Sequence, residues 1–97
     1  MYQVTIHHHD KAWRRGDLED DLFLIAQENF KTRAAAKMFI EREVATRKCK
    51  VIHRQYHKGD EPSFVWAYTG VTWQHENSGE QMEEYYRYEL KKVKLKG

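Results

Sequence analysis

The chain has 97 residues, 40% of them hydrophobic and 33% charged, with a formal net charge of +2. This length allows one domain with a modest core, residues 1–97, and leaves little room for a deep substrate cavity. Thirteen aromatic residues exclude a disordered chain, and the single cysteine, Cys49, excludes an internal disulfide and a cysteine-based zinc site.

The location of the protein is predicted from the same features. A small domain without disulfides is typical of a reducing compartment. The first residues lack the basic start and apolar centre of a signal peptide, and no apolar run is long enough to cross a bilayer. We therefore expect a cytoplasmic protein that makes no membrane contact.

The N-terminal third predicts two strands separated by a polar loop. Tyr2, Val4 and Ile6 alternate with polar residues, which indicates a strand with one buried face. Residues 9–21 are polar and rich in acids, and they predict a loop. Residues 21–27 contain the run Leu-Phe-Leu-Ile-Ala, which is typical of a buried strand, although the spacing also fits a short helix.

The segment from Thr32 to Arg47 predicts the main helix. Thr32 is a favourable N-cap residue, and the three alanines that follow it are strong helix formers. The basic end of the segment suits the negative C-terminal end of the helix dipole. The apolar stripe that would face the core comprises Ala36, Phe39, Ile40 and Val44.

Two further strands are predicted after the helix. Residues 49–58 and 63–75 are rich in β-branched and aromatic side chains, and a turn with glycine and proline at 58–62 separates them. Gly70 interrupts the alternation of the second strand, which predicts a β-bulge. Residues 77–79, Asn-Ser-Gly, predict the next turn.

The C-terminal segment, residues 80–96, fits two structures. Its apolar residues can form one helical face, but the run Tyr-Tyr-Arg-Tyr is typical of a strand. We predict a strand, with a second helix over residues 80–94 as the alternative. The expected fold is therefore a single α+β domain in which one main helix packs on an antiparallel sheet of four to five strands.

The charges of the chain are separated into blocks. Residues 44–58 hold five lysines and arginines and no acid, and residues 86–97 hold five with one glutamate. Residues 17–21 and 76–84 each hold four acids and no base. If the two basic segments lie on neighbouring strands, they form one basic patch.

The histidines and carboxylates do not predict a reaction centre. Consecutive residues of a strand point to opposite faces, so that within the triplet only His7 and His9 can share a face. His53 and His57 would lie about 13 Å apart on a strand, too far for one metal ion. The sequence also has no phosphate-binding glycine loop, GxSxG elbow or HExxH motif. We therefore predict a non-enzyme with no metal, no cofactor and no small-molecule substrate.

Protein binding is the leading prediction for function. The segment from Phe64 to Leu95 is read as a long two-stranded antiparallel arm with one wet face, and aromatic and arginine side chains dominate interface energies. The partner is expected to be another protein, or a second copy in a homodimer. The predicted contacts are Trp66, Tyr68, Trp73, Tyr86, Arg87, Tyr88, Lys91 and Lys92.

Nucleic-acid binding is the alternative prediction. Lysines would contact phosphates and tyrosines on a sheet face would stack on bases. The residues of this second set are Arg47, Lys50, Arg54, Lys58, Arg87, Tyr88, Lys91, Lys92 and Lys94.

No specific motif identifies a family. In its length, its charge and its lack of a catalytic motif, the chain resembles the small accessory proteins of bacteriophages and mobile elements, including those that inhibit host enzymes. The resemblance implies a role in binding rather than in catalysis.

Overall fold

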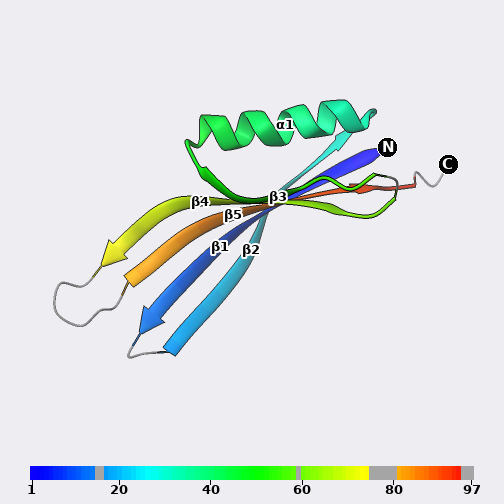
Figure 1. The fold of residues 1–97 in the computed structure, drawn as a ribbon. Coiled ribbons are helices and arrows are strands. Elements are labelled where there is room, and N and C mark those ends of the chain that lie inside the picture. The colour runs from blue at the N-terminus through cyan, green and yellow to red at the C-terminus, as the bar shows by residue number, and fades with distance from the viewer. Residues whose placement is uncertain (15–16, 59, 75–80, 95–97) are drawn as a thin grey trace.

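The computed structural model describes residues 1–14, 17–58, 60–74 and 81–94, with the side chains of 13–14, 17–20, 71–74 and 81 left out of the description. These residues form five strands and one helix (Figure 1). In chain order the elements are β1 (Tyr2–Arg14), β2 (Asp17–Phe30), α1 (Arg33–Thr46), β3 (Lys50–Gln55), β4 (Ser63–Gln74) and β5 (Gln81–Lys92).

The strands form one antiparallel sheet in the order β2-β1-β5-β4-β3, with α1 packed on one face. The predicted single α+β domain is confirmed, and the alternative of a second C-terminal helix is wrong because residues 81–92 form β5. β5 lies at the centre of the sheet. The predicted two-stranded antiparallel arm corresponds to β4 and β5, which do pair with each other, but β3 and β1 flank this pair, so it is part of the sheet and not a free arm.

The helix begins where the sequence predicts. The Thr32 side chain accepts a hydrogen bond from the Ala35 amide at 3.1 Å, so that it satisfies one of the free N–H groups of the first turn. Ala36, Ile40 and Val44 lie four residues apart and are buried, because this spacing places them on one side of the helix.

The core lies between α1 and one face of the sheet. β1 and β5 contribute alternate residues in matching register, with Val4 opposite Leu90 and Ile6 opposite Tyr88. The buried side chains of the core are Val4, Ile6, Ala36, Ile40, Val44, Val65, Ala67, Tyr88 and Leu90. The other sheet face, which we call the open face, is not covered by any helix of the described part of the chain.

The sheet is much longer than the helix. The molecule measures 56 × 25 × 20 Å, whereas fourteen helical residues span about 21 Å. The far ends of the strands therefore extend beyond α1 (Figure 1). The loop predicted over residues 9–21 is wrong, because Asp10 pairs with Asp21 and Lys11 with Asp20 in the β1–β2 hairpin.

The remaining strand predictions agree with the structure. The bulge predicted at Gly70 is confirmed by a register shift between Tyr68 and Gly70 and by a backbone φ of +131° at the glycine. The turn predicted at 77–79 lies outside the described residues. No helix of the described residues has the length and apolarity needed to cross a membrane.

Candidate functional site

β2 exposes a continuous run of large hydrophobic side chains at one edge of the sheet. The exposed fractions are 45% for Leu22, 52% for Phe23, 57% for Leu24 and 45% for Ile25. The sequence correctly predicts a strand here, but the expectation that this strand is buried is wrong. β2 has only one neighbour in the sheet, β1, and α1 does not cover this part of it.

The exposed run points to both faces of the sheet. Leu22 and Leu24 lie opposite His9 and His7, on the open face, whereas Phe23 lies opposite His8 on the face that carries α1. Ile25 is an extra residue in a bulge between Leu24 and Ala26. Neither layer of this chain can therefore bury the whole run.

The outer edge of β2 is suited to pairing with another strand. Its outward N–H and C=O groups have no neighbouring strand among the described residues. Natural edge strands are commonly blunted by lysines or prolines, and residues 17–30 contain neither. The bulge at Ile25 and the carboxylates of the strand are the features of β2 that oppose unspecific pairing at this edge.

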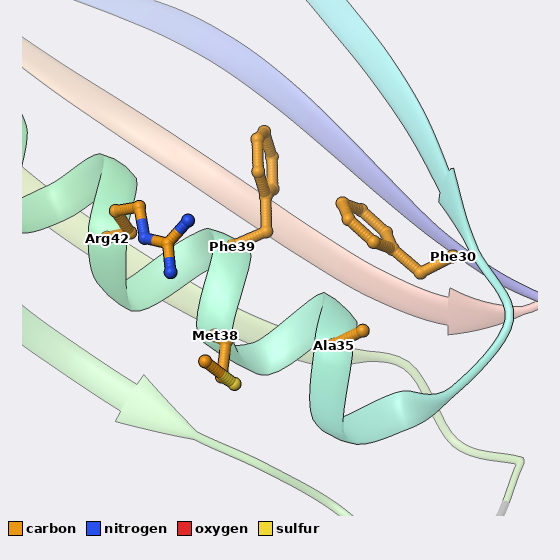
Figure 2. A pocket seen from close by; sticks show the side chains of 5 residues that line it. All are labelled: Phe30, Ala35, Met38, Phe39 and Arg42. Atoms are coloured by element: carbon orange, nitrogen blue, oxygen red, sulfur yellow. The ribbon is translucent and has the colours of Figure 1, made fainter.

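A hollow lies between α1 and the end of β2. Its volume is about 240 Å³, and apolar side chains make up most of its lining (Figure 2). A cavity of about 150 Å³ is large enough for a benzene ring, so this hollow has room for a large apolar side chain. The lining residues are Phe30, Ala35, Met38, Phe39 and Arg42.

The packing of α1 explains why the hollow lies on the β2 side. One flank of the helix is held toward β3, since Glu41 accepts a hydrogen bond from the Tyr56 hydroxyl at 2.6 Å and also pairs with Arg54. The opposite flank faces β2, where the rings of Phe39 and Phe30 lie 5.1 Å apart between centroids. The hollow and the exposed run thus belong to the same edge of the molecule.

This edge is acidic. Residues 17–30 contain five carboxylates and no lysine or arginine. Asp21 and Glu28, which stand on either side of the exposed run, are themselves exposed. We refer to β2, its exposed run and the neighbouring hollow together as the β2 edge.

The predicted protein contacts are divided between the two faces of the sheet. Trp66, Tyr68, Arg87 and Lys91 lie on the open face, whereas Tyr86 and Lys92 lie on the face of α1. The prediction of Tyr88 as a contact is wrong, because this side chain is 0% exposed in the core. The side chain of Trp73 lies outside the described residues.

The open face carries a cluster of rings. His9 lies 5.6 Å from Trp66, and Tyr68 lies 5.0 Å from Tyr85, both measured between ring centroids. The guanidinium of Arg87 lies 5.6 Å from the centre of the Trp66 ring, within the range of a cation–π contact. The rings are inclined to one another, at 61° for His9 and Trp66 and 41° for Tyr68 and Tyr85, so the first pair packs edge to face and the second is tilted.

The predicted single basic patch is not formed. β4 separates β3 from β5, so that the strands of the two basic segments are not neighbours, although the guanidinium of Arg47 at the end of α1 lies 4.3 Å from the centre of the Tyr86 ring on β5. Lys50, Arg87 and Lys91 share the open face, and Lys58 and Lys94 are exposed elsewhere. Three other bases of the predicted set make ion pairs: Arg47 with Glu43, Arg54 with Glu41 and Lys92 with Asp60.

The histidine triplet is divided as the sequence predicts. His7 and His9 point to the open face and His8 to the other face, where its Nε2 atom lies 3.5 Å from Asp10 and 3.3 Å from Glu84. The ligand atoms of His8, Asp10 and Glu84 lie within 4.8 Å of one another, so this group could hold a metal ion. The two contacts of His8 also account for this arrangement without a metal ion.

Burial changes the acidity of several groups. It raises the pKa of the Cys49 thiol and so favours the unreactive protonated form. Burial and the neighbouring Arg87 guanidinium lower the pKa of His7. The guanidinium of Arg87 lies 3.2 Å from the Nδ1 atom of His7 and donates a hydrogen bond to it. Burial also raises the pKa of Tyr88 above its ordinary value. The three groups with these shifted pKa values do not form an acid–base pair in a cleft.

Comparison with protein-family models, with curated proteins and with solved structures finds no match to this chain.

Proposed function

We propose that this chain is a non-catalytic protein-binding module that holds its partner at the β2 edge. The observation that carries the proposal is the exposure of four consecutive large hydrophobic side chains on an edge strand, from Leu22 to Ile25. Scattered exposed hydrophobic residues are ordinary, but a run of exposed apolar side chains along an unpaired strand edge is typical of an interaction site.

The exposed run supplies part of the free energy that binding requires. Complete burial of a large aliphatic or aromatic side chain contributes about 1.5–3 kcal/mol, and about half of that remains available for each of these half-exposed residues. Main-chain hydrogen bonds along the strand would add to the affinity. We place the protein in the cytoplasm, as a small accessory or inhibitor protein of the bacteriophage or mobile-element kind.

The proposal is tested by comparing two matched edge variants. Leu24→Lys places a charge in the exposed run, and Ile52→Lys makes the same change on the opposite edge, where Ile52 is 52% exposed. Each immobilised protein is mixed with a lysate of the source cells. The wild type and Ile52→Lys should retain the same defined partner and Leu24→Lys should lose it. Equal retention by all three proteins would contradict the proposal.

The open face favours a second candidate function, binding of single-stranded nucleic acid. Trp66, Tyr68 and Tyr85 present rings on an uncovered face, with Arg87 beside Trp66. Such a combination of rings and cations binds bases by stacking and phosphates by charge.

This second candidate predicts a defined dependence on salt. Three phosphate contacts from Lys50, Arg87 and Lys91 would give a slope of about −2 in log affinity against log salt for a single-stranded oligonucleotide. Lys91→Ala should make that slope shallower by about 0.7. Fluorescence anisotropy with a labelled oligonucleotide measures both values, and a lack of binding at low salt would exclude this function.

A further inference from the structure

We infer that the partner presents an extended segment in which lysine or arginine residues flank an apolar stretch, and that this segment adds to β2 as a sixth strand. The inference rests on the proposed function and specifies the chemistry of the partner. Two observations support it independently: the hollow beside the open strand edge, and the charge of that edge.

An added strand fits the position of the hollow. In strand addition, main-chain hydrogen bonds supply affinity and pockets for alternate side chains supply specificity. A strand paired with β2 would lie about 4.8 Å outside it, and every second side chain would point to the face that carries α1. One of these side chains would stand next to the hollow that Phe30 and Phe39 help to line, and this apolar lining favours a large apolar group.

The length of the segment follows from the strand. Residues Leu22 to Phe30 span about 26 Å at about 3.3 Å per residue, so a segment of about nine residues reaches from the exposed run to the hollow. Such a segment would cover the aliphatic and aromatic side chains of the run on both faces.

The negative charge of β2 favours basic residues in the partner. Asp21 and Glu28 lie at the two ends of the apolar stretch, and both point to the face of α1, opposite Asp10 and Val4 of β1. Because the bulge adds one residue to β2, a regular partner strand would meet these two carboxylates with residues six positions apart. We therefore expect lysine or arginine at two positions with that spacing and apolar residues between them.

The same charge disfavours a second copy of this chain as the occupant. Two β2 strands paired with each other would bring ten carboxylates and no lysine or arginine into one pair of strands. Like charges that lie directly opposite each other on paired strands are destabilising, and β2 has no base to offset them. A basic foreign segment instead neutralises the edge.

The experiment selects binders from a phage-displayed library of random 12-residue peptides on the immobilised full-length chain. Enriched peptides should carry two basic residues six positions apart with apolar residues between them, and they should lose binding to Leu24→Lys. Glu28→Lys should weaken their binding at least tenfold. The matched control is Glu61→Lys, which makes the same charge change at an exposed position between β3 and β4 and should leave the affinity unchanged.

The other outcomes separate the inference from the proposed function. Peptides that depend on Leu24 but carry no basic residues would overturn the inference and leave the β2 edge as the binding surface. If the wild type self-associates and Leu24→Lys abolishes this association, the inference is likewise overturned, and the β2 edge remains the binding surface. Selection of no peptide, or only of peptides that bind Leu24→Lys equally well, would overturn both.

Discussion

At the scale of single residues, Tyr88 shows how composition alone can mislead. Tyrosine, tryptophan and arginine are enriched in interfaces, and the sequence places Tyr88 in a cluster of tyrosines. In the sheet it lies opposite Ile6 and Val65, on the face that α1 covers, and it is the largest fully buried side chain. Its ring therefore stabilises the fold and is not available to a partner.

The hydroxyl of Tyr88 predicts an unusual response to mutation. The oxygen is buried and has no hydrogen-bond partner among the described residues, and an unsatisfied buried polar group costs about 1–3 kcal/mol. Tyr88→Phe should therefore leave the free energy of unfolding unchanged or raise it by about 1 kcal/mol. Urea denaturation measures this value. A loss of more than about 1 kcal/mol would mean that the hydroxyl makes a bond that stabilises the fold.

The buried tyrosines also predict sensitivity to alkaline pH. Burial raises the pKa of Tyr88, and burial with the hydrogen bond to Glu41 raises that of Tyr56, both from an ordinary value of 10. The folded chain then holds protons that the unfolded chain releases, so the free energy of unfolding should fall as the pH rises above about 10. Denaturation between about pH 8 and about pH 11 should show this fall, and Tyr88→Phe should reduce its slope. An equal slope in both proteins would show that Tyr88 does not contribute.

At the scale of elements, the helix could be predicted from the sequence and the first hairpin could not. α1 has a capping residue, strong helix formers and a buried stripe at helical spacing, which all agree. The far halves of β1 and β2 extend beyond α1, so the helix covers neither of their faces (Figure 1). Alternation of apolar and polar residues is not required there, so residues 9–21 lack the usual signal of a strand.

The capping residue of α1 predicts a defined loss of stability. Thr32→Ala removes the acceptor of the Ala35 amide and should lower the free energy of unfolding by about 1 kcal/mol. Thr32→Ser keeps the hydroxyl and serves as the matched control. Thermal denaturation of the two variants should give a lower midpoint for Thr32→Ala alone. Equal midpoints would show that the cap does not stabilise the domain.

The β2 edge could be predicted only in part for a similar reason. The run Leu-Phe-Leu-Ile-Ala gives a strand, but the same run is found in strands buried on both faces. Its exposure depends on the strand order, which places β2 at the edge of the sheet, and on the path of α1, which lies away from Leu22–Ile25. Both depend on long-range pairing that the periodicity of one segment does not reveal.

At the scale of the whole molecule, one short helix is paired with a sheet about twice its length. The radius of gyration is 15.7 Å, whereas a compact domain of this size has about 13 Å. The elongated shape leaves the open face and the β2 edge uncovered. These uncovered surfaces carry large aromatic and aliphatic side chains that the core does not bury.

The shape and the acidic edge together predict the state of the protein in solution. Because β2 strands would repel each other, the wild type should be a monomer of 11.7 kDa at micromolar concentration. Small-angle scattering should give a radius of gyration near the value of the structure, clearly above that of a compact domain. A doubled mass would show instead that a second copy occupies one of the uncovered surfaces.

The central claim, that a partner strand adds to the β2 edge, is tested most directly by amide hydrogen exchange with and without the tightest-binding selected peptide. We expect slower exchange in residues 22–30 of β2 and in residues 35–42 of α1, with exchange in β3 and β4 unchanged. Protection confined to β4 and β5, or no protection in β2 when the peptide is bound, would contradict the claim.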